Sequence, residues 1–255
     1  MSHDLKANKL LKKIIGILGY KIFPKYAVKT ERFIETRSVN CGDLIKLLTD
    51  KKKINHVIQV GANDGKSDDF LRSSLNKDTK VLLIEPIESA FLDLKKNYSN
   101  FTNVQFINKA IDTKKGKKKI YSVNPINYDY YKKKFQSEDV SWLTVLASFE
   151  ESHLINHGVK SSHIQSTDVD CITFNDLIRQ YNFDKLDLLI IDTEGYDNIL
   201  VKNFIEETKI RPIIIFEWIH MQKDEAKNII KLLDANNYKF FKINKDLICI
   251  QNNYF

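Results

Sequence analysis

The sequence predicts an α/β fold built on a doubly wound, mainly parallel β-sheet with an antiparallel hairpin near the C-terminus. From residue 56 onward, apolar segments of strand length alternate with amphipathic segments of helical length. Apolar strands separated by such helices are typical of a parallel sheet that is covered on both faces. Two apolar segments at 238–243 and 247–251 are joined only by NKD, which predicts the hairpin. The 255 residues, 43% of them hydrophobic, suit one domain with appendages better than two full domains.

The expected strands and helices follow one another in chain order. Strands are expected at HVIQV (56–60), KVLLIE (80–85), NVQFINKAI (103–111), KKKIYSV (117–123), LDLLIID (186–192) and RPIIIFEW (211–218). Helices are expected from the loop after the first strand to about residue 76, and at 89–98, 173–181, 196–208 and 223–237. The strands are continuous apolar runs, whereas apolar residues recur at helical spacing in the helices.

The alternation is interrupted between Gly116 and Asp170. Residues 123–165 are aromatic, polar and irregular in pattern. A loop of this length inside a compact domain is either disordered or functional, and this one holds too many aromatic residues for a flexible linker. We therefore interpret residues 117–168 as an insertion that forms a lid over a ligand site. Extra packing without a ligand remains the alternative for any single aromatic residue.

Residues 1–53 are expected to form a basic, amphipathic helical extension, ahead of a main domain at 54–255. Within residues 5–23, five apolar side chains share one helical face, and the lysines lie mostly on the others: Leu11, Ile14, Ile15, Leu18 and Ile22. One interpretation is peripheral contact of residues 5–23 with an anionic membrane surface. The other, which we favour, is a helix that packs on the main domain or on a partner chain.

Composition limits the class of protein only loosely. The net charge of +7 permits anionic partners, but the lysines are spread along the whole chain. Three widely spaced cysteines without a CxxC pair predict neither a disulfide framework nor a zinc site. The longest apolar runs are far too short to span a membrane. We expect a cytoplasmic protein, located at the inner face of a membrane if the N-terminal helix binds one.

Polar residues at the ends of the expected strands mark the candidate ligand site, because ligands of doubly wound sheets bind at the carboxyl ends of the strands. Four of these strand ends carry carboxylates. The strand-end residues are the loop from Gly61 to Gly65, Glu85, Asn108 with Lys109, Asp192 with Glu194, and Glu217.

The loop GANDG resembles a nucleotide-binding loop but carries the wrong residues for a phosphate. Asn63 stands where a dinucleotide fingerprint has its middle glycine, and Asp64 would repel a pyrophosphate. S-adenosylmethionine has no phosphate, and its ribose diol suits Glu85. The attraction between a carboxylate and a positive charge of this cofactor about 4 Å away is ~4 kcal/mol at an effective dielectric of 20. The pattern therefore favours this cofactor, with a plain tight turn and a solvated glutamate as the alternative.

The motifs VIQVGANDG, VLLIEP, NKAI, VDCITFNDLI and LDLLIIDTEGYDNIL, in this order, resemble those of FkbM-type methyltransferases. The resemblance covers about residues 54–220, and IDTEGYD is its most specific part. It implies a seven-stranded, Rossmann-like class I methyltransferase sheet. It also implies transfer of a methyl group from S-adenosylmethionine to a hydroxyl, typically on a sugar of a glycan or of a glycosylated product. The insertion would then bind the acceptor.

The resemblance also implies roles for single residues. Gly61, Ala62 and Gly65 would line the methionine part of the cofactor, and Glu85 would bind the ribose. Gln59 stands where methyltransferases of this fold commonly have an acidic residue, which leaves the partner of the cofactor's ammonium open. Asp64, a backbone carbonyl and a water are the candidates. The full expected cofactor set is Gln59, Gly61, Ala62, Asn63, Asp64, Gly65, Glu85, Pro86, Asn108, Lys109, Ala110 and Asp192.

Transfer to a hydroxyl needs a base for its proton, and several side chains are candidates for this catalytic role. They are Asp192, Glu194, Glu217, His157 and His220. A divalent cation held by Asp192, Glu217 and Glu194 is an alternative, but we favour a base without a metal. Glu194 and Asp197 would otherwise simply cap the following helix.

A nucleic-acid function is the competing hypothesis. The segments KKGKKKIY (114–121) and YYKKKF (130–135) interleave lysines with tyrosines that could stack on bases. They would suit a ribose methyltransferase that acts on RNA, or a binding protein without activity. We do not favour this hypothesis, because no RNA-binding motif accompanies the lysines.

Overall fold

The computed structural model describes residues 40–51, 53–66, 70–140, 142–219 and 221–252. The amphipathic helix expected at 5–23 and the candidate base His220 lie outside the described residues. The hypotheses about them therefore stay predictions. None of the helices within the described ranges has the length and apolarity that a membrane crossing requires.

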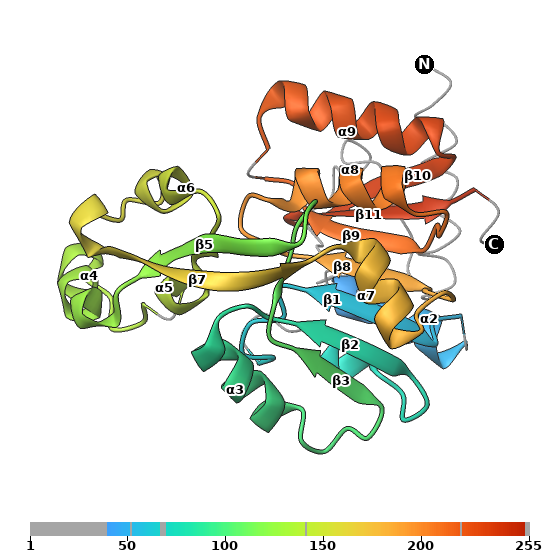
Figure 1. The fold of residues 1–255 in the computed structure, drawn as a ribbon, viewed down its shortest axis with the longest axis horizontal. Helices are drawn as coiled ribbons and strands as arrows, with labels where there is room; N and C mark the ends of the chain where they lie inside the picture. The colour runs from blue at the N-terminus through green and yellow to red at the C-terminus, as the bar shows by residue number, and fades with distance from the viewer. Residues whose placement is uncertain (1–39, 52, 67–69, 141, 220, 253–255) are drawn as a thin grey trace, which may run out of the picture.

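A seven-stranded sheet forms the centre of the molecule (Figure 1). Its strands, in spatial order, are β10 (Tyr238–Ile243), β11 (Asp246–Gln251), β9 (Ile213–Glu217), β8 (Leu188–Ile191), β1 (His56–Val60), β2 (Lys80–Ile84) and β3 (Val104–Ile107). Every neighbouring pair is parallel except those of β11, which runs antiparallel to both β9 and β10. The predicted α/β class, the mostly parallel sheet and the C-terminal hairpin are confirmed.

Helices cover both faces of this sheet because its strands are apolar on both sides. On β1, Val57 packs into the cluster that includes α2 (Cys41–Asp50) and α3 (Glu88–Asn97). Its neighbours Ile58 and Val60 belong to the opposite cluster. That cluster is covered by the helices α7 (Phe174–Tyr181), α8 (Asp197–Glu207) and α9 (Lys223–Ala235). This two-sided covering is the doubly wound arrangement.

A second, four-stranded sheet was not predicted. Its order is β4 (Ala110–Ile111), β7 (Ile164–Ile172), β5 (Gly116–Val123) and β6 (Ala147–Ser148). The single strand expected at 103–111 was therefore wrong, because the chain leaves the main sheet after β3. At that point the Asn108 side-chain amide donates to the carbonyl oxygens of Glu85 (3.0 Å) and Pro86 (3.2 Å), which anchors the turn.

Strands β5 and β7 form a long antiparallel ribbon that reaches away from the main sheet (Figure 1). We call residues 116–172 the arm. Its outer part carries η2 (Pro125–Asn127), α4 (Tyr128–Phe135), α5 (Trp142–Val145), α6 (Glu151–Asn156) and η3 (Ser161–His163). These elements bury a small core of their own that includes Tyr131, Leu143 and Leu154. The segment expected to be irregular is therefore mostly short helices, each too short to show a period in the sequence.

The helix expected from the first loop to residue 76 was also wrong. Among the described residues of this segment only a short 3₁₀ turn forms, η1 (Arg72–Ser74). The hydroxyl of Ser74 donates to the carbonyl oxygens of Phe70 (2.8 Å) and Gly42 (2.9 Å). Short hydroxyl side chains that bind nearby carbonyls in this way compete with a regular helix.

Candidate functional site

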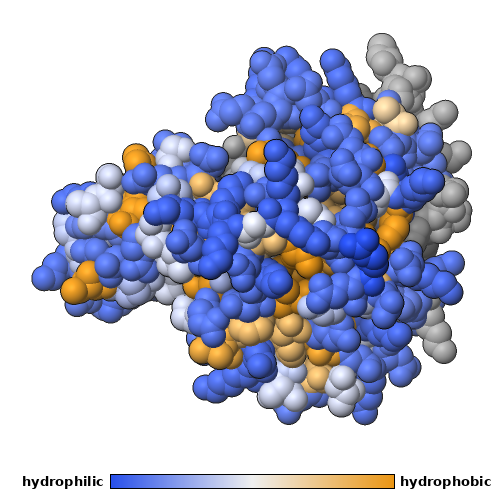
Figure 2. All heavy atoms as spheres, in the orientation of Figure 1, coloured by the Kyte–Doolittle hydropathy of each residue, from blue (hydrophilic) through white to orange (hydrophobic). Residues whose placement is uncertain are grey.

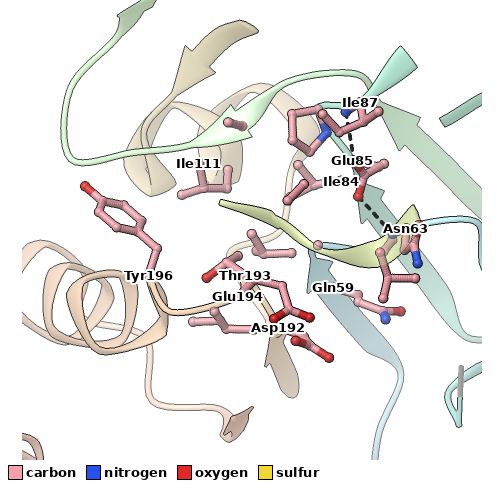
Figure 3. Close-up of a pocket in the computed structure, with 18 of the residues that line it drawn as sticks. Gln59, Asn63, Ile84, Glu85, Ile87, Ile111, Asp192, Thr193, Glu194 and Tyr196 are labelled. Atoms are coloured by element: carbon pink, nitrogen blue, oxygen red, sulfur yellow. Dashed lines mark hydrogen bonds between the residues drawn. The ribbon is translucent and has the colours of Figure 1, made fainter. Parts of the chain in front are cut away.

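A pocket opens at the carboxyl ends of β1, β2 and β8, where the arm meets the main sheet (Figure 3). Its walls come from strand ends, from the loops that follow them, and from the arm segments 144–145 and 147–149. Figure 2 shows apolar residues where the arm joins the main domain, on a face that is otherwise mostly hydrophilic. The polar side chains that line the pocket are Gln59, Asn63, Glu85, Lys109, Thr144, Ser148, Asp192, Thr193, Glu194, Tyr196, Lys245 and Asp246.

Gly61 begins the first loop of the pocket, and no other residue fits there. Its backbone φ is +76°, a value that residues with a Cβ rarely adopt. A Cβ at this position would also lie 1.8 Å from the carbonyl oxygen of Asp192. The amides of Gly61 and Ala62 both donate to the carbonyl oxygen of Ile84 at 3.0 Å. The loop is thus tied to β2 on one side and pressed against the end of β8 on the other.

Glu85 follows β2 and is buried, with only 6% of the residue exposed. Its carboxylate accepts hydrogen bonds from the backbone amides of Asn63 (2.9 Å) and Ile87 (2.8 Å), as Figure 3 shows. Burial raises the pKa of Glu85 to about 7, although these two hydrogen bonds act to lower it. The side chain is therefore fixed in place before any ligand arrives.

Asp192 lies directly after β8 and shares its environment with Glu217, at the end of β9. The Lys245 ammonium, in the turn between β10 and β11, lies 3.2 Å from Glu217 Oε1 and 3.9 Å from Asp192 Oδ2. The Asp192 side chain lines the pocket and remains 35% exposed. Although the side chain is partly exposed, desolvation by the surrounding protein raises the pKa of Asp192 to about 7, which Lys245 opposes and Glu194 and Glu217 reinforce.

Glu194 is held by the arm. Its backbone has a φ of +51°, in the left-handed region, and its carbonyl oxygen accepts a hydrogen bond from the Ser148 hydroxyl at 2.8 Å. Its carboxylate lies 3.2 Å from Nε2 of His153, on α6. In Figure 3, Asp192, Thr193 and Glu194 lie together at the end of β8. This short segment therefore brings two carboxylates to the pocket.

Tyr196 and Phe149 form an aromatic wall where the arm joins the main domain. Their rings are 5.0 Å apart, edge to face, and the Lys118 ammonium lies 4.1 Å from the Phe149 ring and 4.4 Å from the Tyr196 ring. The Tyr196 hydroxyl donates to Asp112 at 2.7 Å, and Lys118 pairs with Asp112 at 3.2 Å. Contacts between a cation and two rings stabilise this wall.

A family model described as the methyltransferase FkbM domain matches residues 59–240. The chain belongs to the FkbM methyltransferase family. It is therefore an S-adenosylmethionine-dependent methyltransferase. No curated protein matches this FkbM methyltransferase significantly.

Three solved structures are similar to this FkbM methyltransferase at low identity. Cofactor-bound Rv0187 from MTB is 10% identical, with 96% of this chain and 91% of that chain covered and a TM-score of 0.43. A fibrillarin pre-rRNA processing protein of Methanococcus jannaschii is 11% identical, with coverages of 88% and 84% and a TM-score of 0.40. A precorrin-6y C5,15-methyltransferase of Geobacter metallireducens is 10% identical, with coverages of 91% and 100% and a TM-score of 0.38. Similarities at this level carry no information on the acceptor.

The side chains of the pocket fit the methionine and ribose groups of the cofactor. Glu85 presents a preorganised carboxylate of the kind that accepts hydrogen bonds from a ribose diol. Gln59 is 8% exposed, and its side-chain oxygen is buried without a hydrogen-bond partner among the described residues. A buried acceptor of this kind favours a donor such as the ammonium of the cofactor. The apolar side chains of Ile87 and Ile111 also line the pocket and suit a flat ring such as adenine.

The structure places most predicted cofactor residues of the FkbM methyltransferase on this pocket. Lining it are Gln59, Gly61, Ala62, Asn63, Glu85, Pro86, Lys109, Ala110 and Asp192. Asp64, Gly65 and Asn108 are not among the lining residues. Asp64 Oδ1 accepts from the Lys66 amide (2.9 Å), and a Cβ on Gly65 would meet Leu94 at 2.6 Å. Asp64, the acidic residue that distinguished the loop in the sequence, therefore shapes the loop. Glu85, Asp192, Glu194 and Asp246 supply the negative charge of the pocket.

The predicted catalytic residues are only partly brought together. Asp192 and Glu194 line the pocket, and Glu217 lies beside it through Lys245. His157 is on the arm, where its Nδ1 lies 2.9 Å from the carbonyl oxygen of His153, and it is not a lining residue. Sequence reasoning missed Lys245 and His153. A lysine in a hairpin turn and a histidine in an irregular insertion carry no local signal of a site.

The site of the alternative divalent cation already contains a positive charge, the ammonium of Lys245. Lys245 lies between Asp192 and Glu217, where a divalent cation would bridge the two carboxylates. Within the described ranges, no three side chains of His, Cys, Asp or Glu are grouped as metal ligands.

Proposed function

We propose that this methyltransferase transfers the methyl group to a hydroxyl oxygen, on a sugar of a glycan or of a glycosylated product. The observation that carries the proposal is the position of the Asp192 carboxylate, which lines the pocket beside the Gly61 loop and lies 3.9 Å from the Lys245 ammonium; burial raises its pKa to about 7. A base is most effective when its pKa is near the operating pH. Asp192 is thus suited to take a proton from a hydroxyl at neutral pH.

An alkyl hydroxyl is the kind of acceptor that needs such a base. The bound cofactor supplies an activated methyl group, so the protein's own residues must chiefly align the acceptor and remove its proton. Asp192 lies at the end of β8, directly beside the glycine loop that would hold the cofactor. Lys245 stabilises the ionised form of Asp192. In a fraction of the molecules Asp192 is therefore ionised and able to accept a proton.

A sugar as the acceptor is supported by the aromatic wall where the arm joins the main domain. Phe149 and Tyr196 line the pocket with aromatic rings, and the exposed Thr144 adds a hydroxyl. Sugars present apolar C–H faces together with hydroxyl groups, and a wall of mixed character suits both. The FkbM family resemblance implies the same acceptor class. On this proposal the arm is the acceptor-binding lid.

The charge of the pocket favours a neutral acceptor over a polyanion. Glu85, Asp192, Glu194 and Asp246 line it, against Lys109 and Lys245. The lysines that suggested RNA are in part engaged locally, since Lys118 pairs with Asp112 and Lys115 pairs with Asp176 at 3.0 Å. No observation therefore favours the nucleic-acid alternative.

The test uses the purified protein, S-adenosylmethionine and a panel of free and linked sugars. S-adenosylhomocysteine release and a mass gain of one methyl group on the sugar are measured together. We expect Asp192→Asn to lower turnover by roughly 100-fold or more, the usual contribution of a general base, while cofactor binding persists in calorimetry. Asp168→Asn, the same change at an exposed position of the arm, is the matched control. Methylation of RNA in place of every sugar, or full turnover by Asp192→Asn, would contradict the proposal.

Removal of metal ions separates the two catalytic alternatives. Because Lys245 supplies the positive charge next to Asp192 and Glu217, we expect full activity after exhaustive treatment with EDTA. Loss of activity that Mg²⁺ or Mn²⁺ restores would favour the metal mechanism instead.

A further inference from the structure

We infer that His153 is a positioning residue that holds the Glu194 carboxylate in the pocket, and that the arm completes the acceptor site through this contact. The inference rests on the proposed function. It concerns the loop between β8 and α8, residues 192–196, which we call the β8–α8 loop. His153 belongs to α6, on the arm, and is separated from Glu194 by 41 positions in sequence.

The first observation is the pair itself. Nε2 of His153 lies 3.2 Å from Oε2 of Glu194, and the two side chains are 11% and 21% exposed. A hydrogen bond in this sheltered position restricts the rotamers of the glutamate far more than a contact on an open surface. Glu194 lines the pocket, whereas His153 does not, so the histidine acts on a ligand only through Glu194.

The second observation is the backbone of the β8–α8 loop. Glu194 has a φ of +51°, which is costly for a residue with a side chain and persists only where neighbouring groups enforce it. The arm supplies such groups, because the Ser148 hydroxyl donates to the Glu194 carbonyl oxygen at 2.8 Å.

The third observation is the packing of the His153 ring on Gly195. A Cβ at position 195 would lie 2.9 Å from Nδ1 and 3.3 Å from Cε1 of His153, so the glycine leaves room for the ring. On its other side the ring lies 4.5 Å from that of His157, whose Nδ1 is 2.9 Å from the His153 carbonyl oxygen. The imidazole therefore contacts both the β8–α8 loop and the end of its own helix.

These contacts give the two carboxylates of the loop different roles. Asp192 is steadied by Lys245 from the main sheet and takes the proton. Glu194 is fixed by the arm and accepts a hydrogen bond from a hydroxyl of the sugar, which aligns the attacking oxygen. A misplacement of the acceptor by about 1 Å can cost 100-fold in rate, so a residue that only orients Glu194 affects turnover strongly.

The test compares His153→Ala, His153→Gln and the control His163→Ala in the full chain. Glutamine places an amide N–H near the position of Nε2, and so restores the hydrogen bond without the ring. His163 is another arm histidine with a side-chain partner, the Tyr131 hydroxyl at 3.0 Å, in a different part of the arm. Hydrogen–deuterium exchange of the peptide that covers 192–197 is measured on the protein without an acceptor, followed by kcat and KM for the sugar that the wild type methylates.

We expect His153→Ala to speed exchange in the 192–197 peptide and to lower kcat by roughly 10-fold to 100-fold, with unchanged cofactor affinity. His153→Gln should recover most of the loss, and His163→Ala should leave both readouts at the wild-type level. Unchanged exchange in His153→Ala would overturn the inference. Equal effects of His153→Ala and His163→Ala would also overturn it, because general loosening of the arm would then explain them.

The exchange readout separates this inference from the proposed function. If the wild type methylates no sugar, the proposed function fails. Faster exchange in His153→Ala would still support the positioning of Glu194 by His153 in that case.

Discussion

Glu85 is the residue that we expect to contribute most to cofactor affinity. Both of its carboxylate oxygens accept backbone amide hydrogen bonds, so the group is rigid and poised to accept from a ribose. Glu85→Gln replaces one acceptor oxygen by a donor that must face an amide N–H. Hydrogen bonds to a charged group contribute about 1.5–3 kcal/mol. We therefore expect calorimetry to show S-adenosylmethionine affinity lowered by roughly 10-fold to 100-fold.

The pH dependence of binding provides a second check on Glu85. With a pKa of about 7, its carboxylate is ionised above that pH and protonated below it. Cofactor affinity should therefore decrease as the pH is lowered from about 8 to 6. The decrease should be smaller in Glu85→Gln, where the remainder reflects Asp192. Glu88→Gln, an exposed position at the start of α3, is the control and should behave as the wild type. Wild-type affinity that does not change with pH would contradict this role.

At the scale of single elements, a substitution in the turn after β1 tests how closely the ends of β1 and β8 approach each other. In Gly61→Ala the new Cβ meets the Asp192 carbonyl oxygen, and the φ of +76° is unfavourable. Gly116→Ala is a matched control, since its φ is +146° but nothing lies within 4 Å of the new Cβ. Backbone strain costs about 1–3 kcal/mol in both, and the clash adds about 1–3 kcal/mol only at Gly61. Denaturant unfolding should show the larger loss for Gly61→Ala, and equal losses would contradict the close approach.

Some elements could be predicted from sequence and others could not, for physical reasons. β1, β2, β8 and β9 are buried on both faces, so their apolar runs identify them. β7 was missed because it belongs to the arm ribbon, where its residues from Gln165 to Asp168 are all exposed and only its last residues are buried. A stretch of strand that is exposed on both faces shows no hydrophobic period. The helix expected before residue 76 failed for a different reason, because the Ser74 hydroxyl binds the carbonyl oxygens of Phe70 and of the distant Gly42 there.

The part of the site that could be predicted from the sequence is the part at the ends of the apolar strands. Glu85 and Asp192 follow apolar runs directly, and the strand-end rule finds them. Lys245 reaches the site only because β11 runs antiparallel, which brings the hairpin turn to the same edge as the parallel strand ends. His153 reaches it only because the arm ribbon returns α6 to the β8–α8 loop. Both contacts depend on topology, which no local pattern encodes.

At the scale of the whole molecule, the arm should be separable from the cofactor site. Val123 and Ile164 are paired across the ribbon, so a short turn can join them in place of residues 124–163. This change removes the outer helices and β6, but leaves Glu85, Gly61 and the main sheet. We expect a folded protein by circular dichroism that still binds S-adenosylmethionine in calorimetry but no longer methylates the acceptor. Turnover at the wild-type rate would contradict an acceptor role for the arm.

The place of β11 in the sheet also has a consequence for biosynthesis. A ribosome makes β8 and β9 before the hairpin, so the carboxylates of Asp192 and Glu217 exist for a time without the ammonium of Lys245. If β8 and β9 pair before β11 is added, these two side chains repel each other, and the protonated, uncharged form is favoured. The hairpin then inserts β11 beside β9 and brings the compensating charge with it. Maturation of the site is thus coupled to completion of the sheet, and a chain released before residue 245 would carry the cofactor loop without a charge-balanced site.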